Sequence, residues 1–98
     1  MAATTLLVTE DPVLTEAVRR VAAVAGRDLE VVSDPHDARA SWMRADDVLV
    51  GDDAVHGCLD SGVRRRPRVA VVTGVRDAEL PWRAVLALGA EAVVPLPS

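Results

Sequence analysis

Two adjacent carboxylates, Asp52 and Asp53, directly follow the apolar run Asp47–Gly51. In parallel α/β proteins, the side chains that do chemistry gather beyond the carboxyl ends of the strands. A carboxylate in that place can accept a phosphoryl group, hold a Mg²⁺ ion, or end a strand as an ordinary polar residue. The residues that accompany the two acids decide between these three roles.

Other polar residues follow two further apolar runs of the chain. Thr9, Glu10 and Asp11 come after the first run, and Thr73 comes after the fourth. If these runs are parallel strands, their polar residues meet at one edge of the sheet. An acid cluster facing a hydroxyl can bind Mg²⁺, and the metal can then support phosphoryl transfer to Asp52.

Five short apolar runs supply the strands that would position these residues. Each is rich in β-branched residues and too short for a helix. The first, third and fourth are apolar on both faces, which is typical of a parallel sheet covered on both sides. The runs are Thr4–Val8, Leu29–Val32, Asp47–Gly51, Val69–Thr73 and Glu91–Pro95.

The segments between these runs carry helix signals. Asp11 and Pro12 can begin the first helix, and Gly26 can end it. Asp34 and Pro35 repeat the same start for a second helix. Weaker patterns predict a third helix over residues 54–60, interrupted by a glycine, and a fourth over residues 80–88.

This order of elements predicts an α/β fold of the flavodoxin type. Right-handed crossovers give a doubly wound, five-stranded parallel sheet with strand order 2-1-3-4-5 in a single domain over residues 1–98. No helix pattern follows the fifth strand, so the final covering helix is missing and the sheet near strands 1 and 5 is underprotected. We therefore expect a fragment of a longer protein, or a partner that covers this face.

Composition excludes several classes of function. The net charge of −4 and the absence of Phe and Tyr argue against nucleic-acid binding, which needs basic surfaces and stacking platforms. The run Arg64–Arg66 is expected to be a solvated loop.

No apolar stretch reaches the roughly 20 residues of a membrane span, and no secretory signal is present, so we expect a cytoplasmic protein without membrane insertion.

The sequence contains no motif that predicts a metal or cofactor site. Cys58 is the only cysteine, and its H-x-C pairing with His56 lacks the second pair that a zinc site needs. The glycines do not form a dinucleotide-binding fingerprint. We therefore predict no metal, no cofactor and no catalytic residue.

The chain resembles a response-regulator receiver domain of the CheY-like fold over nearly its whole length. The stretch "LLVTEDP" is similar to the acidic end of the first receiver strand, and "DVLVGD" places Asp52 at the phosphoacceptor position. The stretch "VAVVTG" places Thr73 at the conserved hydroxyl position. "LALGAEAVVPLP" is similar to the receiver's fourth helix, turn and fifth strand.

The departures from the receiver pattern fall on the residues that do its chemistry. Thr9 and Glu10 stand where a receiver has two acids for Mg²⁺, Leu96 stands at the lysine position, and Val93 replaces the aromatic switch residue. Loss of the lysine removes the cation that neutralises the phosphoryl group, and loss of the aromatic removes the usual readout. The resemblance thus implies a degenerate site, formed by Thr9, Glu10, Asp11, Asp52, Asp53, Thr73 and Leu96.

Several longer stretches indicate a more specific resemblance, to one family of receiver-like domains. "LLVTEDPVLTEAVRRVAAVAG", "RRPRVAVVTG" and "LPWRAVLALGAEAVVPLP" are similar to the N-terminal domain of actinobacterial septum-site-determining proteins, a family grouped with CpaE-like and TadZ-like proteins. In that family an atypical receiver precedes a ParA/MinD-type P-loop ATPase. The resemblance implies a role in protein contact or localisation, during septum placement or pilus assembly. Because this chain has no Walker motif, any ATPase would lie beyond Ser98.

Three functional hypotheses remain open. The first is a non-catalytic pseudoreceiver that contacts a protein partner or a second copy of itself. The second is a phosphorylatable receiver that uses Asp52 with Mg²⁺, and the third is a small-molecule module at the acid-rich edge. For the first, the fourth helix and fifth strand are the expected interaction surface, with Leu80, Trp82, Val85, Leu86 and Val93.

Overall fold

The computed structural model describes residues 3–74 and 79–96 of the chain. Every neighbouring pair of strands is parallel, and the sheet order is β2-β1-β3-β4-β5. The strands are β1 (Thr4–Val8), β2 (Asp28–Val32), β3 (Asp47–Gly51), β4 (Val69–Thr73) and β5 (Ala92–Pro95). The doubly wound fold and the strand order predicted from the sequence are confirmed.

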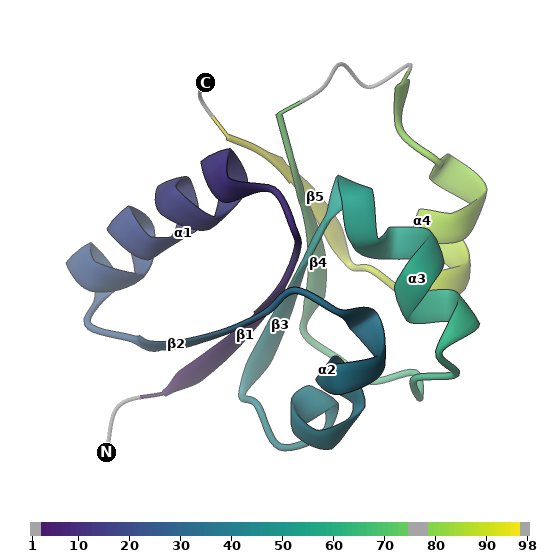
Figure 1. Ribbon diagram of the computed structural model, residues 1–98, viewed down its shortest axis with the longest axis horizontal. Coiled ribbons are helices and arrows are strands. Elements are labelled where there is room, and N and C mark those ends of the chain that lie inside the picture. The colour runs from purple at the N-terminus through teal and green to yellow at the C-terminus, as the bar shows by residue number, and fades with distance from the viewer. Residues whose placement is uncertain (1–2, 75–78, 97–98) are drawn as a thin grey trace.

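The helices are divided unequally between the two faces of the sheet. Helix α1 lies alone on one face, and α2, α3 and α4 lie on the other (Figure 1). Their bounds are α1 (Pro12–Ala25), α2 (Pro35–Trp42), α3 (Val55–Asp60) and α4 (Trp82–Leu88), with a short 3-10 turn η1 (Asp52–Ala54) before α3.

The helix starts follow from the capping residues in the sequence. The Asp11 side chain accepts hydrogen bonds from the backbone N–H groups of Val13 and Leu14, which have no partner inside α1. At the other end, Gly26 adopts the left-handed conformation at φ 68°, which costs glycine little. Asp34 caps α2 in the same way as Asp11 caps α1.

The main hydrophobic core lies between the sheet and the three helices α2, α3 and α4. Trp42 is its largest side chain and is only 1% exposed, as expected for a tryptophan that packs within the fold rather than on a surface. A smaller cluster beneath α1 contains Leu7, Val18 and Val72. Strand β1 is thereby covered on both faces, since neither Leu6 nor Leu7 has any exposed surface.

The underprotected part of the sheet is at the β5 edge. The burial of Leu6 and Leu7 shows that the expectation of an open face near strand 1 is wrong, because α1 already covers that strand. On β5, by contrast, Val94 remains 40% exposed and its neighbours Ala92 and Pro95 are also exposed.

Gly57 allows α3 to pack closely against the start of α2. A Cβ atom at Gly57 would lie 2.6 Å from the ring carbon Cγ of Pro35. From the sequence, this glycine was expected only to weaken the predicted third helix. The structure gives it a packing role, since only a residue without a side chain permits this approach.

The arginine-rich loop before β4 is more than the solvated segment that the sequence predicts. Arg66 donates from Nη1 to the carbonyl oxygens of Trp42, the last residue of α2, and of Ala45, three residues further on. Arg65 donates from Nη1 to the carbonyl oxygen of Ala87, near the end of α4. Two of the arginines thus satisfy carbonyl groups at helix ends, which explains why this loop needs cations.

A membrane span is not found in the described parts of the chain, where no helix is both long and apolar enough to cross a bilayer.

Candidate functional site

The residues at the carboxyl edge of the sheet are held together by the Asp53 carboxylate. Its Oδ1 atom accepts a 2.6 Å hydrogen bond from Thr9 Oγ1, and its Oδ2 atom accepts a 2.9 Å bond from the backbone N–H of Glu10. Both oxygens of Asp53 are therefore bonded to the segment that follows β1. The bond ties the end of β3 to the end of β1 across 44 residues of sequence.

Thr9 is the buried centre of this arrangement. It is 1% exposed, and its hydroxyl oxygen also accepts a 3.0 Å hydrogen bond from the backbone N–H of Asp11. Asp11 in turn uses its carboxylate to cap α1. The position at which a receiver carries an acid is thus filled by a hydroxyl whose donor and acceptor functions are both used within the fold.

Gly51 makes the Thr9–Asp53 contact possible. A Cβ atom on this residue would lie 2.4 Å from Asp53 Oδ1 and 2.6 Å from Thr9 Oγ1. Any side chain at Gly51 would therefore occupy the space of the hydrogen bond itself. The sequence reasoning missed this role; the glycine directly before the two acids was the available signal.

Asp52 lies beside this contact but is not part of it. Its carboxyl group is partly buried, and the loss of hydration raises its pKa above the ordinary value of 3.8. The nearby charges of Asp53 and Asp11 also raise the pKa of Asp52, while hydrogen bonds to the backbone of Asp52 and Asp53 oppose the rise. The electrostatic environment therefore disfavours further negative charge at Asp52.

Thr73 and Leu96 complete the edge on the β4–β5 side. Thr73 is 1% exposed, and its carbonyl oxygen accepts a 2.8 Å hydrogen bond from the backbone N–H of Leu96. The Leu96 side chain packs partly buried against the cluster that contains Leu7 and Val72. At this place an apolar side chain takes the position that the receiver resemblance assigns to a lysine.

The acids at this edge do not fit a Mg²⁺ site. Within residues 3–74 and 79–96, no three His, Cys, Asp or Glu side chains are grouped so that they could hold a metal ion. The carboxylates of Asp53 and Asp11 are already bonded to Thr9 Oγ1 and to backbone N–H groups. Magnesium needs several oxygens arranged around one point, which this set does not supply.

Cys58 offers no reactive alternative at the same edge. It is fully buried, and burial together with the charge of Asp53 raises the pKa of its thiol to about 12. A thiol with so high a pKa is not ionised at neutral pH and is a poor nucleophile.

Only part of the interaction surface expected on α4 and β5 is accessible. Leu80 and Val85 are buried, at 6% and 2% exposure, and Val93 packs partly buried against the main core. These three residues must be removed from the predicted surface, because their side chains are buried or partly buried within the fold. Trp82 and Leu86 remain, with 42% and 68% of their surface exposed, one helical turn apart on α4.

The sheet order, the covering helices and the acid-rich carboxyl edge define a receiver-type α/β domain. The chain belongs to the family described as the Rv3660c-like, CheY-like N-terminal domain, whose model matches residues 8–98. The fold is similar to the crystal structure of a CheY-like response regulator receiver domain protein from Methanospirillum hungatei JF-1. That comparison has a TM-score of 0.65 at 16% identity and covers 100% of this chain and 84% of the other.

Two curated relatives come from Mycobacterium tuberculosis. They are "Uncharacterized protein Rv3660c" of strain H37Rv and "Uncharacterized protein MT3760" of strain CDC 1551, each 32% identical over 88 residues. The match covers 89% of this chain and 25% of each relative. The chain thus spans about a quarter of the length of the curated relatives it matches.

Proposed function

We propose that this receiver-type domain is a pseudoreceiver, which contacts other proteins and catalyses no phosphoryl transfer. The observation that carries the proposal is the hydrogen bond between Thr9 Oγ1 and Asp53 Oδ1. At one of the two positions where the receiver resemblance expects a metal-binding acid, the chain carries a hydroxyl that is bonded to Asp53 within the fold. Leu96 supports the same conclusion, because no cation stands there to neutralise a phosphoryl group.

A second candidate is a receiver that is phosphorylated at Asp52. The partial exposure of Asp52, at the carboxyl end of β3, favours it, since the carboxylate is accessible to a phosphodonor. The raised pKa of Asp52 and the neighbouring charges of Asp53 and Asp11 disfavour it, because a phosphoryl group would add negative charge to an edge that is already acidic.

Intact-mass measurement separates the two candidates. The protein is incubated with acetyl phosphate and Mg²⁺, alongside an Asp52→Asn variant as the matched control. The pseudoreceiver proposal expects both proteins to keep their mass. An added phosphoryl group on the unchanged protein that is lost in Asp52→Asn would overturn the proposal and establish the second candidate.

For the longer protein we propose a place beside a P-loop ATPase of the ParA/MinD type, in septum placement or pilus assembly. The resemblance to CpaE-like and TadZ-like proteins is the support for this step. Its test is ATP hydrolysis by the full-length protein, with and without residues 1–98. Hydrolysis that needs a Walker lysine outside this domain supports the proposal, and a full-length protein without nucleotide binding contradicts it.

The proposed contact surface on α4 is formed by its two large exposed hydrophobic side chains, Trp82 and Leu86. Aromatic and large aliphatic side chains of this kind supply most of the energy in protein interfaces. Within the described sheet, strand β5 is an edge strand that pairs with β4, and a strand of a partner can pair with the edge of a sheet. We propose self-association through this surface.

A further inference from the structure

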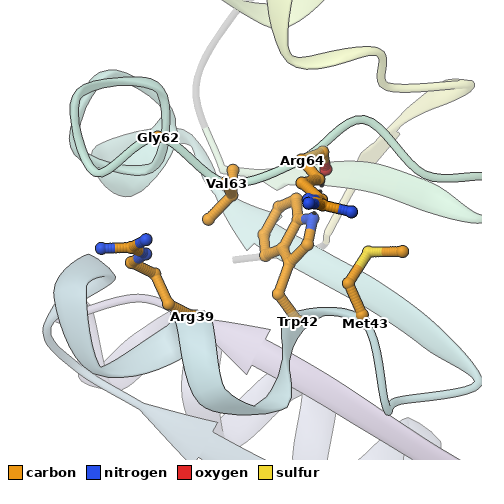
Figure 2. Close-up of a pocket in the computed structure, with 6 residues that line it drawn as sticks. All are labelled: Arg39, Trp42, Met43, Gly62, Val63 and Arg64. Carbon is orange, nitrogen blue, oxygen red and sulfur yellow. Dashed lines mark hydrogen bonds between the residues drawn. The ribbon is translucent and has the colours of Figure 1, made fainter.

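A small pocket lies between the end of α2 and the loop that joins α3 to β4 (Figure 2). Its lining residues directly precede β3 and β4 in the chain, so it lies at the opposite edge of the sheet from Asp52. The volume is about 220 Å³. The lining residues are Arg39, Trp42, Met43, Gly62, Val63 and Arg64.

The charge of the pocket is positive, although the protein as a whole carries −4. Arg39 and Arg64 are both exposed, and no acidic residue lines the pocket. In the part of the chain that the structure describes, neither guanidinium group forms a hydrogen bond or an ion pair. The neighbouring Arg65 and Arg66 differ, because their guanidinium groups bond to backbone carbonyl groups.

The two walls of the pocket are fastened to each other. The indole Nε1 of Trp42 donates a 2.7 Å hydrogen bond to the carbonyl oxygen of Arg64. In the opposite direction, Arg66 donates to the carbonyl oxygens of Trp42 and Ala45. Because the backbone on both sides is fixed, the pocket keeps its shape before any ligand binds, which lowers the entropic cost of binding. The guanidinium groups of Arg39 and Arg64 lie on opposite sides of Trp42 (Figure 2).

An apolar side chain borders the positive groups. Met43 is 55% exposed, and its flexible thioether lies on the rim next to Trp42 (Figure 2). Methionine adapts to different apolar partners and is common on binding surfaces. A ligand that carries an apolar group beside its negative charge can therefore use two kinds of contact here.

The size of the pocket and the nature of its cations restrict the ligand. Pockets for drug-sized ligands usually enclose about 300–1,000 Å³, so this one suits a side chain better than a nucleotide. Guanidinium groups bind carboxylates through two parallel hydrogen bonds. We propose that the pocket binds an acidic segment of a partner protein, with one Glu or Asp carboxylate at Arg39, a second at Arg64, and an apolar neighbour against Met43. This deepens the interaction role proposed above by naming a second contact, separate from Trp82 and Leu86.

The test is a titration followed by ¹H–¹⁵N spectra of the protein. The probe is the blocked peptide acetyl-Leu-Glu-Glu-Leu-amide, and the matched neutral peptide carries Gln in place of Glu. We expect saturable shifts at the backbone amides of Gly62–Arg64 and at the indole N–H of Trp42. In the double variant Arg39→Ala/Arg64→Ala the affinity falls by about tenfold or more. The control variant Arg19→Ala/Arg83→Ala removes the same charge elsewhere and keeps the affinity.

Several results would overturn the proposal. They are the absence of shifts at millimolar peptide, equal binding of the Gln peptide, or an affinity that the Arg39→Ala/Arg64→Ala change does not alter. Inorganic phosphate that binds as tightly as the Glu peptide would also overturn it, because the pocket would then be a general anion site. None of these results bears on the mass measurement at Asp52, so the two proposals fail separately.

Discussion

Thr9 and Asp53, 44 residues apart, are joined by a 2.6 Å hydrogen bond at the carboxyl edge of the sheet. The donor is almost fully buried, and the acceptor carboxylate also receives the backbone N–H of Glu10. The bond engages Thr9, which stands at one of the two positions where the receiver resemblance expects a metal-binding acid. Thr9 and Asp53 lie where a receiver has its reactive site, and here their hydrogen bond stabilises the fold.

The Thr9→Val substitution removes the hydroxyl and leaves Asp53 Oδ1 without its donor. Hydrogen bonds to charged groups contribute about 1.5–3 kcal/mol, so we expect the free energy of unfolding to fall by about that amount. Urea denaturation measures the change. A double-mutant cycle with Asp53→Ala isolates the pair, because alanine removes the acceptor, and additive effects of the two substitutions would show that the bond contributes nothing.

The Gly51→Ala substitution places a methyl group in the space of the same hydrogen bond. The new Cβ would lie within 2.8 Å of three atoms of Thr9 and Asp53, so the strands must shift or the bond must break. We expect a loss of about 1–3 kcal/mol in unfolding free energy. Gly74→Ala is the control, since a Cβ there meets no atom of residues 3–74 or 79–96 within 4 Å. Equal effects of the two substitutions would contradict the close-contact argument.

The Asp52→Asn substitution is expected to change how stability depends on pH. Because burial raises the folded-state pKa of Asp52 above 3.8, its ionised form is less stable in the folded protein than in the unfolded chain. The ionised carboxylate therefore lowers stability above the folded-state pKa, and this loss disappears as pH falls toward 3.8. An asparagine side chain carries no charge at any pH, so the Asp52→Asn variant does not lose stability in this way.

Thermal unfolding at a series of pH values measures this effect. The Asp52→Asn variant should be more stable near neutral pH by no more than about 0.5 kcal/mol, because the carboxyl group is partly solvated. The difference should vanish below pH 3.8, where Asp52 is protonated in both states. A variant that is less stable at neutral pH would show that the Asp52 carboxylate makes a favourable contact instead.

Trp82→Arg and Leu86→Arg each place a charge on the proposed self-association surface of α4. Sedimentation across a concentration series should show that the dissociation constant of the dimer rises by about tenfold or more in each variant. Val24→Arg is the control, because Val24 is an exposed valine on α1 at the other face of the sheet. Dimers that persist in both α4 variants, or a protein that is monomeric throughout, would contradict the proposal.

The fold could be predicted from the sequence because its signals are local. Each strand is a short β-branched run, and Asp11–Pro12 and Asp34–Pro35 mark the helix starts within one turn. The parallel order then follows from the handedness of the crossovers.

The contacts at the site could not be predicted, because they depend on pairs of residues distant in sequence. The positions of the predicted strand ends singled out Asp52 as the candidate site residue, but Asp53 is the acid that bonds to Thr9. Burial on α4 likewise depends on the depth at which the helix packs, so Leu80 and Val85 could not be separated from Trp82 and Leu86 by sequence alone. The free arginines Arg39 and Arg64 come from different segments that only the fold brings together.

The most direct test of the account is the response of the carboxyl edge to a phosphoryl mimic. Beryllofluoride and Mg²⁺ are added to the ¹⁵N-labelled protein, and the backbone amides of Asp52, Asp53 and Thr73 are followed. A pseudoreceiver whose acids do not form a metal site predicts no saturable shift at these amides. Saturable shifts at Asp52 and Thr73 that disappear in the Asp52→Asn variant would contradict the account and show that the receiver chemistry is intact.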